Sequence, residues 1–215
     1  MIGLLNVLEC AAGTGARKVV YAGSGGTLYG EPKVLPVKEA HRNRGRPISP
    51  YGISKAVGIH YLEFYRRTRG LDYTTLALAN VYGPRQDSEG EAGVVALFAT
   101  QMLAGDMPTV YGDGEQTRDY TYVDDAVHAF ALAAERGSGA LLNVGTGVET
   151  SVNQLVRLLA QLTGFRGKPQ YGPRRDGDLR RSALDSQLAA KELGWKPWTP
   201  LRDGLRATVE WYRES

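Results

Sequence analysis

The first part of the chain alternates between segments with the hydrophobic spacing of a helix and short apolar runs typical of buried strands. Residues 3–12 place apolar side chains three and four positions apart, which predicts a helix, and the run K-V-V-Y-A at 18–22 predicts a buried strand. Ser49 and Pro50 are typical of a helix N-terminus, and Y-T-T-L-A-L-A at 73–79 predicts a second strand. Helix, strand, helix and strand in this order indicate a parallel sheet covered by helices.

The helix predicted from Pro50 ends at Gly70, a residue type that favours helix C-termini. Its apolar residues form a stripe at helical spacing: Ile53, Val57, Tyr61, Phe64 and Tyr65. His60 lies at the edge of this stripe and is expected to pack there. Cys10, the only cysteine, is expected to be a small buried residue of the first helix.

The rest of the chain also alternates between helical and extended patterns. Residues 32–50 contain four prolines and predict a loop. The patterns predict helices at 94–104, 124–134, 152–162, 184–193 and 201–212, strands at 108–111 and 141–144, and a turn at 112–114.

Composition places the chain among soluble globular proteins. It has 215 residues, of which 42% are hydrophobic and 23% charged, so a buried core is expected and a disordered or fibrous chain is not. No apolar stretch is long enough to span a membrane, and the apolar start lacks the basic residues of a signal peptide. We therefore expect a cytoplasmic protein without membrane association, and one cysteine excludes an internal disulfide.

The formal net charge is +3, and arginines cluster near 42–46, 66–69 and 174–181. Three interpretations are open: a solvated surface, nucleic-acid binding, or an anionic substrate held by one or two arginines. No nucleic-acid-binding motif accompanies the clusters, so no nucleic-acid partner is expected. The histidines at 41, 60 and 128 lack metal-ligand spacing, so no metal is expected either.

Tyr51 and Lys55 lie four residues apart on the predicted helix, and their side chains therefore share one face. An ammonium group near a phenol favours the phenolate and lowers its pKa from about 10, which gives a general base near neutral pH. An ordinary exposed helix pair is the alternative. The small residues that follow the preceding strand, A-G-S-G-G-T-L-Y-G-E-P at 22–32, leave room for a ligand where open α/β sheets bind theirs.

These motifs, in this order, resemble the extended short-chain dehydrogenases, and among them most of all the UDP-glucose 4-epimerases. The resemblance covers essentially the whole chain. Its further motifs are L-A-N-V-Y-G-P-R at 78–85, V-Y-G-D-G-E-Q-T-R-D-Y-T-Y-V-D-D at 110–125, N-V-G-T-G at 143–147, R-R-D-G-D at 174–178 and E-L-G-W-K-P at 192–197.

The resemblance implies an NAD-dependent enzyme that removes a hydride from C4 of a nucleotide-bound sugar and returns it to the other face. Tyr51 is then the general base, and Lys55 binds the cofactor ribose. The other implied contacts are Ala22, Gly23 and Leu78 to NAD, Thr27 and Asn80 to the sugar and phosphate, Arg118 and Arg175 to the diphosphate, Asp178 to the nucleotide ribose, and Tyr111 to the base.

The implied fold is the C-terminal part of a Rossmann-like, doubly wound parallel sheet with a small α/β substrate-binding lobe. Residues 1–84 are expected to form the partial NAD-binding unit. Residues 85–215 are expected to form mainly the substrate-binding lobe, with segments that return to the Rossmann core. The two long helices at 3–12 and 51–69 resemble those that pair across a homodimer in this family.

The chain departs from the family at two places. The family's sugar-binding Ser or Thr falls at Gly25, so we expect Ser24 to replace it, and the Asp-Glu pair of the dehydratases is replaced by Gly26 and Thr27. No G-x-x-G-x-x-G motif follows an N-terminal strand, although this motif holds the pyrophosphate in the family. We therefore expect a fragment of a longer protein, with the strand at 18–22 unpaired on one side.

Three functions remain open at this point. The parent protein is a 4-epimerase, or it is another nucleotide-sugar enzyme of the family such as a reductase or decarboxylase. The third alternative is a non-catalytic protein that binds a nucleotide sugar and lacks the cofactor-binding half.

Overall fold

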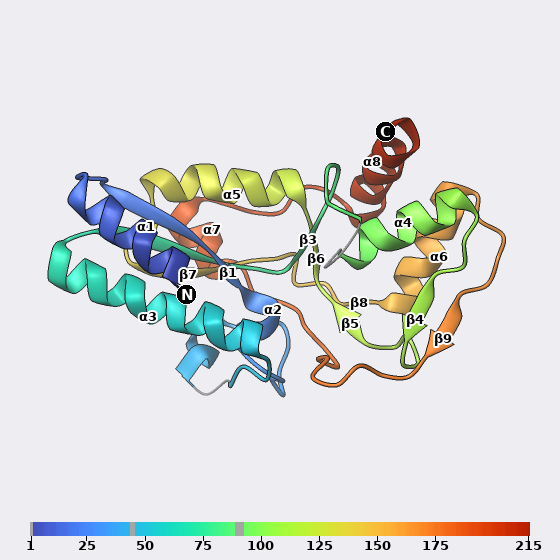
Figure 1. Ribbon diagram of the computed structural model, residues 1–215, viewed down its shortest axis with the longest axis horizontal. Helices are drawn as coiled ribbons and strands as arrows, with labels where there is room; N and C mark the ends of the chain where they lie inside the picture. Colours follow the sequence, from blue (N-terminus) through green and yellow to red (C-terminus); the bar gives the residue numbers. More distant parts are fainter. Residues whose placement is uncertain (1, 44–45, 89–92) are drawn as a thin grey trace.

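A computed structural model describes residues 2–43, 46–88 and 93–215 (Figure 1). A parallel sheet with helices on both faces forms one end of the molecule, and a smaller helical lobe forms the other. The helices are α1 (Ile2–Gly13), α2 (Gly25–Leu28), α3 (Pro50–Arg69), α4 (Val94–Ala104), α5 (Val123–Glu135), α6 (Val152–Thr163), α7 (Gln187–Leu193) and α8 (Leu201–Glu214), with a 3₁₀ turn at Glu39–Asn43.

The strands are short, and most belong to pairs outside the main sheet. They are β1 (Lys18–Ser24), β2 (Asp72–Leu78), β3 (Asn80–Tyr82), β4 (Thr109–Tyr111), β5 (Thr117–Arg118), β6 (Tyr120–Tyr122), β7 (Ala140–Val144), β8 (Thr150–Ser151) and β9 (Gln170–Gly172). The main sheet has the order β1-β2-β7, and both of its pairs are parallel, as the sequence pattern predicts.

The register of the main sheet brings its carboxyl ends together. Ser24 of β1 pairs with Leu78 of β2, and Leu78 pairs with Val144 of β7. In open parallel sheets ligands bind at this edge. The fold therefore brings the small-residue stretch after β1 and the residues after β2 to the same edge.

Two apolar layers cover the two faces of the sheet because alternate residues of a strand point to opposite sides. Tyr73 of β2 packs with Leu8 of α1 and Leu62 of α3, while Leu76 of the same strand packs with Ala129 of α5 and Leu193 of α7. This arrangement of helices on both faces confirms the predicted doubly wound α/β class.

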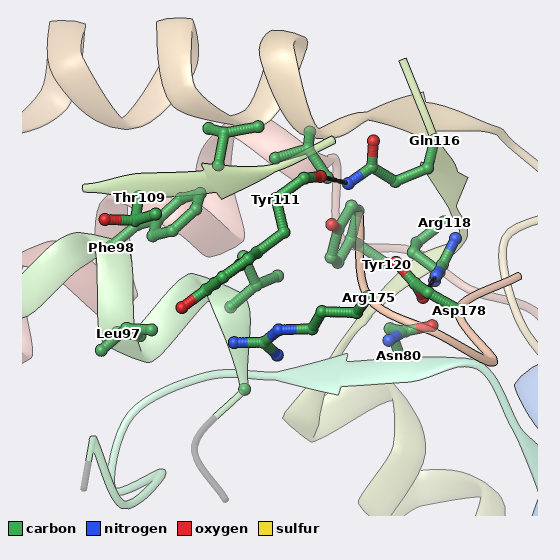
Figure 2. Close-up of a pocket in the computed structure, with 14 residues that line it drawn as sticks. Asn80, Leu97, Phe98, Thr109, Tyr111, Gln116, Arg118, Tyr120, Arg175 and Asp178 are labelled. Atoms are coloured by element: carbon green, nitrogen blue, oxygen red, sulfur yellow. Dashed lines mark hydrogen bonds and ion pairs between the residues drawn. The ribbon is translucent and has the colours of Figure 1, made fainter. Parts of the chain in front are cut away.

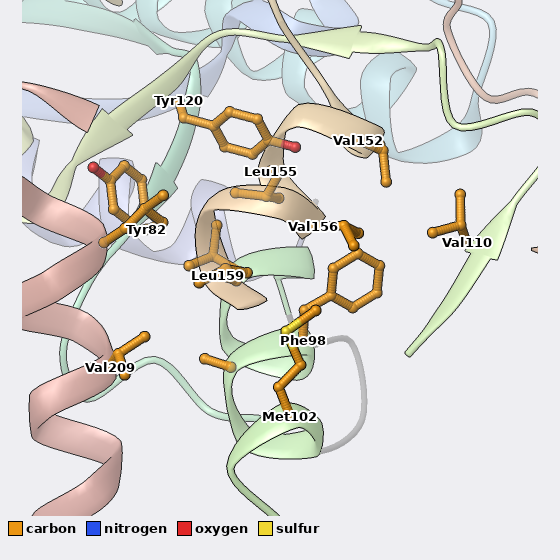
Figure 3. Close-up of a cluster of buried hydrophobic side chains, with 13 residues drawn as sticks. Tyr82, Phe98, Met102, Val110, Tyr120, Val152, Leu155, Val156, Leu159 and Val209 are labelled. Carbon is orange, nitrogen blue, oxygen red and sulfur yellow. The ribbon is translucent and has the colours of Figure 1, made fainter. Parts of the chain in front are cut away.

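The smaller lobe has a separate core between α4, α6 and α8 (Figure 3). Phe98 and Met102 of α4 contact Leu155 and Leu159 of α6 in this cluster, and Val209 comes from α8. Strand pairs lie beside it: β3 with β6, β4 with β9, and β5 with β8. The pairing of β3 with β6 joins the lobe to the segment that leaves the main sheet.

The helix α3 begins and ends where the sequence predicts, but its buried face coincides only in part with its apolar stripe. The Ser49 hydroxyl accepts a hydrogen bond from Gly52 N, and Gly70 ends the helix at φ +69°. However, Ile53 and Phe64 are 51% and 50% exposed, and the buried face is formed by Gly52, Gly58, Ile59, Leu62 and Tyr65. Tyr65 of the apolar stripe therefore belongs to the buried face, whereas Ile53 and Phe64 of the same stripe face outward.

Exposure also corrects two smaller predictions. Cys10 is exposed on α1 and is not a core residue. The His60 side chain is 69% exposed and lies 3.4 Å from the Glu63 carboxylate, so it does not pack at a buried edge. Both residues lie on the outward sides of helices that cover the sheet with their other sides.

The remaining corrections concern short elements. The helix predicted from Leu184 begins only at Gln187, because Leu184 is fully buried and forms a parallel bridge with Val37. The predicted loop at 32–50 contains the 3₁₀ turn, and its residues 44 and 45 lie outside the described part. The sequence patterns did not predict β3, β5, β6, β8 or β9, each two or three residues long.

The carboxylate of Asp119 connects three segments at the edge of the sheet. It is 1% exposed and accepts hydrogen bonds from Thr146 N at 2.9 Å, Thr146 Oγ1 at 2.6 Å, Gly147 N at 2.9 Å and Leu184 N at 3.1 Å. A Cβ on Gly145 would lie 2.6 Å from the same carboxylate. The N-V-G-T-G motif is thus a loop shaped to surround this side chain.

We predict that Asp119→Ala lowers the free energy of unfolding by on the order of 3 kcal/mol, because several buried donors lose a charged acceptor. Urea denaturation monitored by fluorescence measures this change. Asp203→Ala, at an exposed position of α8, is the matched control and is expected to change stability by less than about 0.5 kcal/mol. Equal stability losses in the two variants would contradict the prediction.

Candidate functional site

One cavity, of about 310 Å³, brings together five residues that the sequence assigned to a substrate (Figure 2). These residues are Asn80, Tyr111, Arg118, Arg175 and Asp178. They are separated by up to about a hundred positions along the chain, so only the fold can assemble them. The sixth predicted substrate residue, Thr27, does not line this cavity.

Each of these side chains comes from the end of a short element or from an irregular segment. Asn80 begins β3, Tyr111 ends β4, and Arg118 ends β5. Arg175 and Asp178 lie in the segment 173–186 between β9 and α7, which has no helix or paired strand apart from the bridge at Leu184. Hydrogen bonds to its neighbours must therefore hold this segment in place.

Arg118 is the best fixed cation of the cavity. Its guanidinium forms an ion pair with Asp178 and donates hydrogen bonds to the carbonyl oxygens of Thr117 and Leu179, both at 2.7 Å. Its side chain is only 15% exposed. A fixed guanidinium presents its N–H groups in one orientation, which suits an oxyanion such as a phosphate.

Arg175 comes from the same irregular segment as Asp178, and its side chain extends toward Tyr111 (Figure 2). Its guanidinium carbon lies 3.9 Å from the centroid of the Tyr111 ring, a cation–π contact, and Figure 2 shows the two side chains stacked. The Tyr111 carbonyl accepts a hydrogen bond from Gln116 Nε2 at 2.8 Å, which holds the end of β4. The cavity thus combines an aromatic surface with two arginines.

Sequence reasoning did not find the apolar part of the lining. Leu97 and Phe98 of α4, Val110 of β4 and Tyr120 of β6 contribute to it. The Tyr120 hydroxyl is buried without a hydrogen-bond partner among the described residues, and burial raises the pKa of this phenol. The one sequence signal for Tyr120 is its spacing: in an extended stretch, residues two positions apart point to the same side, so Tyr120 is expected on the same side as Arg118.

The predicted catalytic pair lies at the carboxyl end of β1. Lys55 Nζ donates a hydrogen bond to the Ala22 carbonyl at 3.0 Å and lies 5.7 Å from the centroid of the Tyr51 ring. Tyr51 is 55% exposed in the first turn of α3. The hydrogen bond fixes the Lys55 ammonium beside Ala22 and Gly23, while the Tyr51 phenol remains accessible to a ligand.

The two hydroxyls near Gly25 are paired with each other. Thr27 Oγ1 donates to Ser24 Oγ at 2.9 Å, so the Ser24 proton is free to donate to a further acceptor. Gly25 has no space for a side chain, because an added Cβ would lie 2.4 Å from the Leu184 side chain and 3.0 Å from the Ala77 carbonyl. A hydroxyl-bearing side chain at residue 25 would therefore require Leu184 to move.

Asn80 connects the cavity with the strand-end residues. A Cβ added to Gly26 of α2 would lie 3.6 Å from Asn80 Oδ1. Asn80 N in turn donates to the Asp119 carbonyl at 2.9 Å, beside Arg118. The strand-end segment and the cavity are therefore neighbouring parts of one region.

Ion pairs surround the cavity and shift the pKa values of their carboxyl groups. Hydrogen bonds from Arg181 hold the pKa of Glu149 below its usual value of 4.5, with a further contribution from Thr117, and Arg180 lowers the pKa of Asp113 to about 2. Burial instead raises the pKa of Asp119, although its hydrogen-bond donors oppose this shift.

The part of the chain that the structure describes has neither a membrane-spanning helix nor a group of metal ligands. In the ranges 2–43, 46–88 and 93–215 no helix is both long and apolar enough to cross a bilayer. Over the same ranges, no three His, Cys, Asp or Glu side chains are grouped so that they could hold a metal ion.

A parallel sheet with Ser24, Tyr51 and Lys55 at its carboxyl edge, beside a lobe that supplies arginines and an aromatic ring, defines a Rossmann-like α/β protein with a candidate site at that edge. The profile of the NAD dependent epimerase/dehydratase family matches residues 1–145. The chain belongs to this family.

Its relatives include UDP-glucose 4-epimerases. The enzyme of that name from Mycolicibacterium smegmatis is 46% identical over 216 residues, which span 100% of this chain and 68% of the relative. The crystal structure of the Thermotoga maritima UDP-glucose 4-epimerase with UDP-glucose superimposes with a TM-score of 0.97 at 49% identity, and the match covers 100% of this chain and 69% of that one. The Thermus thermophilus enzyme with NAD gives 0.92 at 40% identity, with 99% and 69% covered.

Other reactions occur among more distant relatives. A UDP-glucuronic acid decarboxylase from Xenopus tropicalis is 33% identical across 100% of this chain and 51% of the relative. A dTDP-glucose 4,6-dehydratase from Streptomyces griseus is 38% identical over 79% of this chain and 51% of its own length. Family membership alone therefore leaves the reaction open.

We predict that the stability difference between the unaltered chain and Glu149→Gln depends on pH. Because the folded state lowers the pKa of Glu149, its ion pair stabilises the fold above pH 4.5, and this contribution is lost as the pH falls through the folded-state pKa. Urea denaturation should give a difference of about 1 kcal/mol at pH 7 that shrinks as the pH falls below 4.5. Glu210→Gln, exposed on α8, is the control, and a pH-independent difference for Glu149→Gln would refute the prediction.

Proposed function

We propose that this chain supplies the substrate-binding and proton-transfer residues of a UDP-glucose 4-epimerase. The observation that supports this best is the assembly of Asn80, Tyr111, Arg118, Arg175 and Asp178 around one cavity beside the strand-end residues. Relatives with this activity match the whole chain at 46% and 49% identity. We also retain residues 1–84 and 85–215 as the proposed cofactor-binding and substrate-binding units.

The strand-end residues fit one end of an NAD molecule. Lys55 presents a fixed ammonium group that suits ribose hydroxyls, and Ala22, Gly23 and Leu78 border it at the ends of β1 and β2. A Cβ on Gly23 would lie 3.0 Å from Thr75 Cγ2, so the backbone there stays free of side-chain bulk. When bound, NAD supplies the hydride acceptor and donor, and the protein supplies the groups that move the proton.

Tyr51 is the proposed proton-transfer residue. As the phenolate, its exposed side chain can accept the proton of the sugar 4-hydroxyl while the C4 hydride passes to NAD, and the resulting phenol can return that proton when the hydride comes back. Ser24 can donate a hydrogen bond to the same sugar oxygen, because Thr27 already donates to Ser24. Lys55 orients Tyr51 from the adjacent turn of α3.

The cavity is proposed to bind the nucleotide and the diphosphate. Arg118 and Arg175 offer two guanidinium groups to the diphosphate oxygens, and the Tyr111 ring offers a face to the base. Asp178 can accept from ribose hydroxyls as well as from Arg118. Nucleotide binding therefore holds the sugar near Tyr51 while its 4-keto form turns to present the opposite face.

The proposed function predicts that one substitution impairs the chemical step and that another impairs UDP binding. Tyr51→Phe should lower kcat for the conversion of UDP-galactose to UDP-glucose by at least about 100-fold, because the general base is lost, with an unchanged dissociation constant for UDP. Arg175→Ala should weaken UDP binding by about tenfold. Isothermal titration calorimetry with UDP and a coupled assay with added NAD measure both effects, and Arg202→Ala, exposed on α8, is the control.

Each alternative has its own outcome in this experiment. Absence of UDP binding by the unaltered chain would overturn the proposal. UDP binding without conversion, in a chain that binds the added NAD, would favour a non-catalytic nucleotide-sugar-binding protein, and release of CO₂ from UDP-glucuronate would favour a decarboxylase. Equal loss of activity in Tyr51→Phe and Arg202→Ala would remove Tyr51 from the mechanism.

We further propose that two copies of the chain associate through α1 and α3. The outward side of α3 exposes Ile53 and Phe64 at 51% and 50%, and α1 exposes Ile2 and Val7 at 76% and 55%. The two helices pack side by side, so these residues lie on adjacent helices. An apolar surface of this kind favours burial against a second copy.

Phe64→Glu should convert the dimer into a monomer, because it places a charge in the centre of the apolar contact. Sedimentation velocity at micromolar concentration measures the mass. Val127→Glu on α5, where the native side chain is 58% exposed, is the matched control and should leave the dimer intact. A monomeric unaltered chain, or dissociation of both variants, would disprove this interface.

A further inference from the structure

The segment 173–186 supplies Arg175 and Asp178 to the cavity, yet it has almost no regular backbone hydrogen bonding of its own. Its position depends on contacts to residues elsewhere in the chain. Arg118 holds the Leu179 carbonyl and the Asp178 side chain, but these groups belong to the proposed substrate contacts themselves. Contacts from residues outside the cavity lining must therefore also hold this segment in place.

Arg180 connects this segment to three other parts of the site. Its carbonyl accepts from Thr117 N at 3.0 Å, next to Arg118. Its backbone N–H donates to Glu31 Oε1 at 3.0 Å, just after the strand-end segment with Ser24 and Thr27. Its guanidinium binds Asp113 with two hydrogen bonds, Nη1 to Oδ1 at 2.8 Å and Nη2 to Oδ2 at 3.1 Å.

The Asp113 end of this ion pair is itself fixed. Asp113 lies in the turn that directly follows Tyr111, and its backbone carbonyl accepts from Asn153 Nδ2 of α6 at 3.0 Å. Asn153 N also donates to the Gly114 carbonyl at 3.0 Å, and the Tyr171 hydroxyl donates to Asn153 Oδ1 at 3.0 Å. The turn is thus bound to the core of the lobe, and Arg180 attaches the irregular segment to it.

We propose that Arg180 and Asp113 are positioning residues that hold Arg175 and Asp178 at the correct distance from Tyr111 for nucleotide binding. Neither residue lines the cavity, so each acts through the segment or turn that contains it. A bidentate guanidinium–carboxylate pair fixes both distance and orientation, which a lysine cannot do. This inference rests on the proposed nucleotide site and adds two residues to it.

The exposure of the Arg180–Asp113 ion pair limits how much it can contribute to UDP binding. The side chains of Arg180 and Asp113 are 45% and 58% exposed, so the pair is screened by solvent and its contribution is modest. Because Arg180 lowers the pKa of Asp113 to about 2, the pair stays ionised throughout the usual assay range. Its effect on binding should therefore be independent of pH from 5 to 8 but sensitive to salt.

The test is a double-mutant cycle on UDP binding, with Asp113→Asn, Arg180→Gln and both together. Each single variant should weaken UDP binding by about three- to fivefold, and the double variant should be no weaker than the singles, because all three lack the same ion pair. The loss should shrink in 1 M NaCl, and Arg180→Lys should fall between the unaltered chain and Arg180→Gln. Arg206→Gln removes a similarly exposed ion pair with Asp203 on α8 and is the matched control.

Hydrogen exchange of the ligand-free chain gives a second readout that does not need UDP. The amides of residues 174–180 should exchange faster in Arg180→Gln than in the unaltered chain, while those of α6 and α8 stay the same. If the unaltered chain binds UDP and the single variants bind it equally well, or if their effects add, the positioning role is wrong. If the unaltered chain binds no UDP, the proposed function fails first, and unchanged exchange in Arg180→Gln would then also reject the anchor.

Discussion

The buried carboxylate of Asp119 is the contact on which the site depends most. It lies between Arg118, which points to the cavity, and Tyr120, which packs in the core of the smaller lobe. It accepts hydrogen bonds from Thr146 in the loop after β7 and from Leu184 in the irregular segment 173–186. One desolvated anion therefore joins the sheet to the lobe, and its burial is tolerated because donors surround it.

The sheet edge and the smaller lobe carry chemically different groups on the two sides of Asp119. The sheet edge offers a hydroxyl pair, a phenol and an ammonium, groups that can move or hold a proton. The lobe offers guanidinium groups and an aromatic face, whose chemistry suits an anion and a planar ring. Because Asn80 lies two residues after the end of β2 and also lines the cavity, the two sets meet where the chain leaves the sheet.

Sequence patterns predicted the long elements well because periodicity is strongest there. The ends of α3 followed from Ser49 and Gly70, and the parallel order followed from alternating helices and strands. The patterns failed where a few residues pair across long separations, as β3 does with β6, and they did not show that part of the α3 stripe faces outward, at Ile53 and Phe64. The site residues came from motif resemblance, whereas the Arg180–Asp113 ion pair needed three-dimensional coordinates, since nothing local in the sequence relates these two positions.

The close approach of Leu184 to Gly25 has an evolutionary consequence. A serine at residue 25 would collide with Leu184 as that side chain is now packed, so this change and a smaller residue at 184 depend on each other. Neither step is neutral alone: the first creates a clash, and the second leaves a cavity beneath α2. The two positions are therefore epistatic, because the effect of a substitution at residue 25 depends on which side chain stands at residue 184.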